Sequence, residues 1–132
     1  MSQENVEVVR RFIEAYNRRD LERIIEMIDP TFEFRSRLVG LESVHRASEG
    51  FPRTYFEMLN DAYERFQVVL SEFIDAGPAV LAAGRAEWRG KASGVQGETP
   101  ILPAFWLQAG KFVRSETFTD RTEALEAVGL SE

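Results

Sequence analysis

The chain has 132 residues, a net charge of −6 with acidic and basic residues intermixed, and no cysteine. This length favours one domain covering residues 1–132, and the lack of cysteine excludes disulfides and thiolate sites and gives no sign of an oxidising compartment. Because there is no concentrated basic face, no apolar run of roughly 20 residues and no signal-peptide pattern at the start, we expect a cytoplasmic protein that binds neither nucleic acid nor membrane.

The first part of the chain predicts two helices placed end to end. Apolar residues recur at every third or fourth position in residues 3–17, which indicates one amphipathic helix. Polar residues interrupt this pattern at 17–19. Asp20 can then cap a second helix, whose apolar stripe continues to Ile28.

A short strand is expected directly after the second helix. Pro30 cannot continue a helix and favours an extended conformation for the residue before it. Residues 31–35 alternate between apolar and polar, as in a half-buried strand. Phe32 and Phe34 therefore share one side of this strand.

The rest of the chain changes from irregular to helical and then to strand periodicity. Residues 36–50 show no regular pattern, and a third helix is expected over 52–63 because proline suits a first helical turn. After residue 65 the period is two, and the short links between successive strands predict antiparallel pairing. The expected strands are 66–75, 79–90, 96–109 and 111–120, followed by a short helix over 121–128.

Strand 79–90 carries small residues on one of its faces. Ala82, Gly84 and Ala86 lie between Val80 and Trp88 at alternate positions. If the helices cover that face, these small residues predict a cavity of a few hundred Å³ in front of the sheet. The opposite face, which would meet solvent or a partner subunit, carries Leu81, Ala83, Arg85, Glu87 and Arg89.

The element order predicts an α+β fold with helices on one face of a curved sheet. In three stretches the chain resembles the SnoaL-like polyketide cyclases of the nuclear transport factor 2-like superfamily. That resemblance implies a cone-shaped fold, with a curved antiparallel sheet wrapped around three N-terminal helices, and a homodimer formed through the outer face of the sheet. The stretches are VEVVRRFIEAYNRRDLERIIEMIDPTFEFR at 6–35, FIDAGPAVLAAGRAEWRG at 73–90, and FWLQAGKFVRSETFTDRTEALEAVGL at 105–130.

The same resemblance implies a conical pocket for a small apolar or aromatic molecule. The first two helices and the following strand would wall one side of it, and the two tryptophans could stack on a flat ligand. Aromatic residues at such spacings also occur simply as core, so both interpretations stay open. The candidate pocket residues are Phe12, Tyr16, Phe32, Phe34, Tyr55, Leu59, Trp88 and Trp106.

One known mechanism of the superfamily is excluded by the residues present. Its steroid isomerases use an aspartate base and an oxyanion hole made of a tyrosine and a protonated aspartate. In this chain those three positions fall at Phe34, near Phe12 and near Pro100. None of the three chemical groups is there.

The chain shows only a faint similarity to a second group of the superfamily, the limonene-type epoxide hydrolases. Those enzymes use an Asp–Arg–Asp arrangement, to which Arg85, Glu87 and Glu116 would correspond. The alignment is uncertain by one residue, and one residue of slip in a strand moves a side chain to the other face. The small-residue face of strand 79–90 also places Arg85 and Glu87 outside the pocket.

Two residues remain as catalytic candidates. Asp120, at the end of the last strand, could act as the general base of a cyclase, but its spacing from Glu123 also fits a helix cap. His45 is the only histidine, so a multi-histidine metal site is excluded and neither metal nor cofactor is expected. His45 lies in the irregular segment, either simply exposed or at the pocket rim, where it would suit acid–base chemistry near neutral pH.

The sequence therefore predicts a small-molecule-binding protein and leaves its activity open between two classes. One is a cyclase, isomerase or hydrolase of unknown substrate, and the other is a non-catalytic ligand-binding or protein-interaction module. A buried carboxylate or histidine in the pocket would favour the enzyme. A dry aromatic pocket without a titratable group would favour the binding module.

Overall fold

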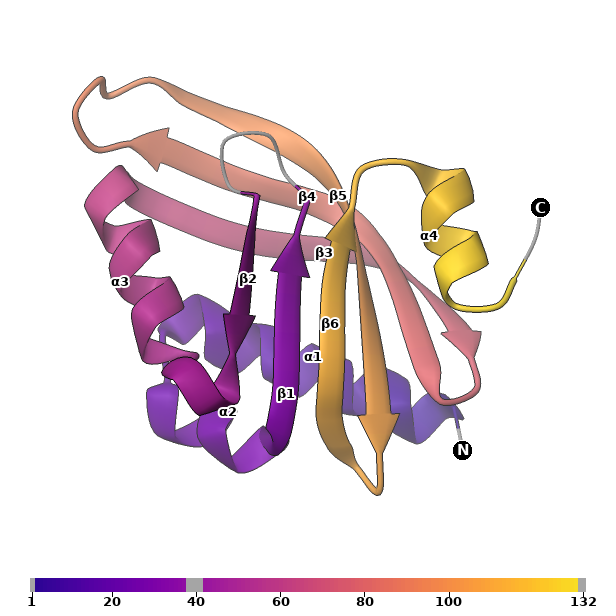
Figure 1. Cartoon of the computed structure of the whole chain (residues 1–132). Helices are drawn as coiled ribbons and strands as arrows, with labels where there is room; N and C mark the ends of the chain where they lie inside the picture. The colour runs from indigo at the N-terminus through magenta and orange to yellow at the C-terminus, as the bar shows by residue number, and fades with distance from the viewer. Residues whose placement is uncertain (1, 38–41, 131–132) are drawn as a thin grey trace.

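A computed structural model describes residues 2–37 and 42–130 of the chain (Figure 1). It has a mixed α+β architecture, which confirms the predicted fold class. Within the described residues, no helix is long and apolar enough to cross a membrane. The helices are α1 (Ser2–Arg18), α2 (Leu21–Met27), the 3-10 helix η1 (Ala47–Glu49), α3 (Arg53–Ala62) and α4 (Arg121–Ala127).

The strands form one mixed sheet in the order β2-β1-β6-β5-β4-β3. The antiparallel pairing predicted for the last four strands is confirmed, whereas β1 lies parallel to β6. A parallel pair needs a long connection, which α3 and four strands (β2, β3, β4 and β5) supply here. The strands are β1 (Ile28–Ser36), β2 (Ser43–Arg46), β3 (Tyr63–Ala76), β4 (Ala79–Gly90), β5 (Gln96–Gln108) and β6 (Lys111–Phe118).

The polar break between the first two helices fastens the end of α1 to strand β3. The Asn17 side chain donates to the carbonyl oxygen of Val68 (2.8 Å) and accepts from its N–H (2.9 Å). Arg19 has a positive φ of 59°, and its guanidinium donates to the carbonyl oxygens of Tyr16 and Phe66. The break thus satisfies backbone groups of both elements and fixes α1 against the sheet.

The segment from α2 to η1 differs from the sequence prediction in two ways. Strand β1 begins at Ile28 rather than residue 31, so α2 ends one residue earlier than its apolar stripe suggested. The segment predicted to be irregular, 36–50, contains β2 and η1, while its residues 38–41 lie outside the described part. Strand β2 is too short to show a period of its own, and its pairing with β1 holds it in place, with His45 opposite Phe34.

Helix α4 packs on the outer face of the sheet, which corrects the prediction that all helices share one face (Figure 1). Leu81, expected to meet solvent or a partner, is fully buried there. The sequence did not predict this because α4 is separated by two strands from the residues that it covers on β4. The buried outer-face cluster consists of Ala79, Leu81, Ala104, Phe118, Ala124, Leu125 and Val128.

The remaining outer face carries the predicted row of alternating charges, and these charges are paired within the chain. Arg85 contacts Glu87 at 2.8 Å and Glu98 at 3.7 Å, and Arg65 also reaches Glu87. Arg89 pairs with Glu64 on the neighbouring strand β3 at 2.9 Å. A second copy of the chain is therefore not needed to neutralise this face.

Candidate functional site

A small aromatic cavity lies between the helices and the concave face of the sheet. Its volume is about 50 Å³. Helices α1 and α3 and all strands except β2 contribute to its wall, so it sits where the two layers meet. The lining residues are Phe12, Ile13, Tyr16, Phe32, Phe34, Ser36, Phe51, Tyr55, Phe66, Val68, Ala86, Ile101, Pro103, Phe105, Ser115 and Thr117.

Helical and strand periodicity explain how neighbouring residues reach this cavity. Phe12 and Tyr16 stand one turn apart on α1 and therefore share a face. The Phe12 ring packs on Phe105 of β5, with centroids 6.1 Å apart. Phe32 and Phe34 are alternate residues of β1, so both point to the concave side, as predicted.

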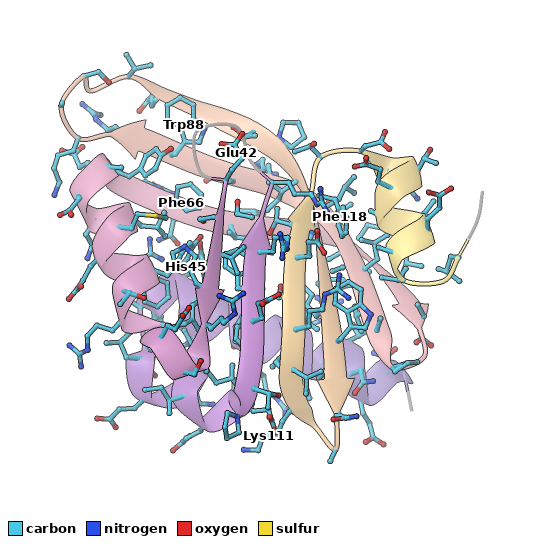
Figure 2. All side chains as sticks on the ribbon, in the orientation of Figure 1. Glu42, His45, Phe66, Trp88, Lys111 and Phe118 are labelled. Atoms are coloured by element: carbon cyan, nitrogen blue, oxygen red, sulfur yellow. The ribbon has the colours of Figure 1, made fainter. Side chains whose placement is uncertain are left out.

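Five of the predicted pocket residues line the cavity and three do not. Leu59 is buried in the main core at 1% exposure. Trp88 donates from Nε1 to Thr99 Oγ1 at 3.0 Å and lies towards the far end of the β4–β5 hairpin (Figure 2). Trp106 packs in the outer-face cluster. The five that line the cavity are Phe12, Tyr16, Phe32, Phe34 and Tyr55.

The hollow expected along strand β4 is much smaller than predicted. Ala86 lines the cavity, but Ala82 and Gly84 do not. A Cβ atom on Gly84 would lie 2.0 Å from the carbonyl oxygen of Val69, because strand β3 approaches β4 closely there. Gly84 therefore allows close packing of β3, and neither Gly84 nor the buried Ala82 creates the predicted space of a few hundred Å³.

Two tyrosines supply the central polar feature of the cavity wall. The hydroxyls of Tyr16 on α1 and Tyr55 on α3 form a buried hydrogen bond of 2.8 Å. Burial raises the pKa of Tyr55 to about 12. Burial, together with the neighbouring Tyr55, also raises the pKa of Tyr16 well above its usual value. Both hydroxyls are therefore protonated and uncharged at neutral pH.

Three further hydroxyl residues in the wall were missed in the sequence. Ser36 comes from β1, and Ser115 and Thr117 come from β6. Ser115 donates to the carbonyl oxygen of Ala104 on β5 at 3.0 Å. A bulge at Val113 shifts the alternation of β6, so that counting in twos from the buried Phe112 gives the wrong face.

The same bulge turns Glu116 away from the cavity. Its side chain is 2% exposed and lies between Arg114, at 2.8 Å, and Arg37. Burial alone would raise the pKa of Glu116, but hydrogen bonds from the two guanidiniums outweigh burial and lower it. Glu116 is thus an ionised, paired carboxylate on the outer face. It does not face the cavity, so the structure does not support an arrangement like that of the epoxide hydrolases.

The two catalytic candidates occupy different sides of the fold. His45 stacks on Phe34 and meets the Tyr55 ring edge-on, with centroids 5.0 Å apart, on the α3 side of the molecule (Figure 2). Burial lowers the pKa of His45, so its ring is neutral at pH 7. Asp120 is exposed and accepts a hydrogen bond from the Glu123 N–H at 2.9 Å, which caps α4. Neither residue lines the cavity.

The chemistry available in the cavity wall is limited to rings, aliphatic groups and hydroxyls. Among the described residues that line it there is no Asp, Glu, His, Lys or Arg. In the described part of the chain, no group of three or more His, Cys, Asp or Glu is placed to hold a metal ion. Such a wall suits an uncharged apolar or aromatic molecule with one or two hydrogen-bonding atoms.

Comparison with known protein families identifies the family of this chain. The family model of the SnoaL-like domain matches residues 9–115. No curated protein sequence matches the chain.

Solved structures share the fold at low sequence identity. A nuclear transport factor 2-like protein of unknown function from Burkholderia pseudomallei is 20% identical, with coverage of 98% of this chain and 99% of that one and a TM-score of 0.77. TerC, co-crystallised with polyporic acid, is 18% identical (95% and 98% covered, TM-score 0.76). A putative SnoaL-like polyketide cyclase from Jannaschia sp. is 18% identical (100% and 96% covered, TM-score 0.75). At these identities the likeness establishes the fold alone.

Proposed function

We propose that this chain, which belongs to the SnoaL-like domain family, is a non-catalytic binding protein for a small apolar or aromatic molecule. One observation carries the proposal: the described lining of the aromatic cavity contains no carboxylate and no histidine. General acid–base chemistry most often uses such a group within hydrogen-bond reach of the ligand. The two tyrosines of the lining are poor bases at neutral pH, because burial raises their pKa values. Binding needs only the apolar wall and its hydroxyls.

The small volume of the cavity sets a condition on binding. About 50 Å³ is less than the roughly 150 Å³ of an engineered apolar cavity that binds benzene. A ring-sized ligand therefore enters only if side chains of the wall move aside. Phe34 and Phe51, which pack with centroids 6.2 Å apart, are two wall rings that would have to move in this way. Co-crystallisation of the related TerC with polyporic acid supports the idea that this scaffold accepts ligands.

A partly filled cavity should weaken binding while the fold is kept. Ala86→Val places two additional methyl groups at the cavity wall, whereas Ala83→Val makes the same change on the opposite face of β4. We expect toluene, titrated by nuclear magnetic resonance, to bind wild type and Ala83→Val but to bind Ala86→Val at least about tenfold more weakly. Equal binding to all three proteins would contradict the proposal.

An enzymatic function is the second candidate, and the position of His45 favours it. The ring of His45 packs on Phe34 and Tyr55, both of which line the cavity. Movement of these rings on ligand entry would bring a neutral imidazole to the ligand. A cyclase, isomerase or hydrolase acting in this way should lose about 10²–10⁴-fold in turnover in His45→Gln. Unchanged turnover in that variant would exclude His45 as the acid–base group.

The homodimer also remains a proposal. It is supported by the family resemblance and by the outer face of β5, where Trp106 and Leu102 are only half-buried. A symmetric dimer places the same patch of both subunits in contact. Light scattering at micromolar concentration should give twice the chain mass of 15.1 kDa. A monomer at that concentration would rule the dimer out.

A further inference from the structure

We propose that the Tyr16–Tyr55 hydroxyl pair makes this cavity select uncharged aromatic molecules that carry a hydrogen-bonding oxygen, as phenols do. This inference rests on the proposed binding function, because it concerns what the same cavity prefers. Its basis is the hydrogen-bonding capacity of the pair and the charge of everything around it.

The pair has one hydroxyl proton more than it uses. Each phenol hydroxyl can donate one hydrogen bond and accept others. In the bond between Tyr16 and Tyr55 one hydroxyl donates and the other accepts, so the accepting tyrosine keeps its own proton. Among the described residues, neither hydroxyl has a further hydrogen-bond partner. Because both tyrosines line the cavity, a ligand oxygen placed beside them can accept a hydrogen bond from that remaining O–H group.

The surroundings of the pair disfavour a charged ligand. The described lining contains no ionic side chain that could neutralise a carboxylate or an ammonium group. The guanidinium of Arg19 lies 5.3 Å from the Tyr16 ring, but it donates to two backbone carbonyls and does not line the cavity. A charge brought into this cavity would lose its hydration without gaining an ion pair. Burial also keeps both phenols protonated, since it raises their pKa values.

Aromatic rings alone would give a different preference. A cage of rings attracts quaternary ammonium ions through cation–π interactions. The rings of this cavity are joined by hydroxyls from the tyrosine pair and from β1 and β6, which favour an oxygen-bearing ligand instead. Tetramethylammonium is therefore the probe that separates the two preferences.

The test compares toluene with phenol in wild type and in three variants, by chemical-shift titration. The double variant Tyr16→Phe/Tyr55→Phe removes both hydroxyls and keeps both rings. The control is Tyr63→Phe, which alters the third tyrosine of the chain, a residue that does not line the cavity. We expect the ratio of phenol affinity to toluene affinity to fall about three- to tenfold in the double variant, and to stay unchanged in Tyr63→Phe. In Tyr55→Phe the ratio should be retained, because the remaining Tyr16 hydroxyl can donate to phenol directly.

Charged probes complete the test. Benzoate and tetramethylammonium should bind wild type at least about tenfold more weakly than phenol. A charged probe that binds as tightly as phenol would overturn the inference, and so would an unchanged affinity ratio in a folded double variant. If the double variant does not fold, the test uses nuclear Overhauser effects measured on the wild-type protein with bound phenol. Effects between phenol and the rings of Tyr16 and Tyr55 support the inference, and their absence overturns it.

Failure of the inference can be told apart from failure of the proposed function. If toluene binds but the tyrosine variants do not change the affinity ratio, the cavity is a binding site without this selectivity. If neither toluene nor phenol binds wild type, the proposed function fails and the inference fails with it.

Discussion

Removal of the two buried tyrosine hydroxyls, singly and together, should show strong coupling in the free energy of unfolding. Tyr55 is 4% exposed, and in Tyr16→Phe its buried hydroxyl loses its hydrogen-bond partner. In Tyr55→Phe the hydroxyl of Tyr16 loses its partner in the same way. Leaving a buried hydroxyl unpaired costs about 1–3 kcal/mol. The double variant leaves no unpaired hydroxyl, so it should cost about 1–2 kcal/mol less than the sum of the singles.

Urea unfolding followed by circular dichroism measures these differences. Tyr16→Phe combined with Tyr63→Phe is the matched control, since no hydrogen bond joins those two residues among the described contacts. That control pair should be additive to within about 0.5 kcal/mol. If the free-energy changes of Tyr16→Phe and Tyr55→Phe also add to within about 0.5 kcal/mol, the reasoning is refuted. Such additivity would mean that each hydroxyl forms a hydrogen bond with another group once its tyrosine partner is removed.

Three further predictions concern stability. Gly84→Ala should cost about 3 kcal/mol or more, because its Cβ would meet the backbone of Val69 at 2.0 Å. Gly90→Ala should cost about 1 kcal/mol or less by the same urea assay, because its Cβ would press only on the flexible Ser93 side chain and would meet the Val95 carbonyl oxygen at an ordinary contact distance of 3.7 Å. Asp120→Ala should cost about 1 kcal/mol through loss of the α4 cap, and Asp120→Asn much less; a large loss of turnover in Asp120→Asn, with folding intact, would instead identify a general base. The raised pKa of Tyr55, about 12, means that the unfolded chain releases this proton first; the contribution of Tyr55 to stability should therefore be fully present below pH 10 and be lost between pH 10 and about 12, by about 1.4 kcal/mol per pH unit. A Tyr55→Phe profile with the same slope in that window would contradict this.

The fold class was predictable because it depends on local periodicity. The helical spacing of Phe12 and Tyr16 and the alternation of Phe32 and Phe34 are properties of neighbouring residues, and each pair forms one face as soon as its element forms. The order of elements then limits the way in which helices and strands can be layered. For the same reason, four of the five cavity-lining residues that were predicted come from these two early segments.

The polar part of the site was decided by contacts between segments far apart in the chain. Tyr16 and Tyr55 are separated by 39 positions, and their hydrogen bond exists only because α1 and α3 cover the same face of the sheet. The bulge at Val113 depends on how β6 pairs with β5, and it alone determines that Ser115 faces the cavity while Glu116 faces outward. A period-two pattern carries no information about such a bulge.

The size of the cavity was likewise a tertiary property. The sequence indicated small residues at Ala82 and Gly84 but not the reason for them. In the structure the backbone of β3 at Val69 fills the space in front of Gly84, because the pairing of β3 with β4 is irregular just beyond Leu70. A small residue leaves a hollow only where no neighbouring backbone approaches, and strand pairing, which joins distant parts of the chain, decides where that happens.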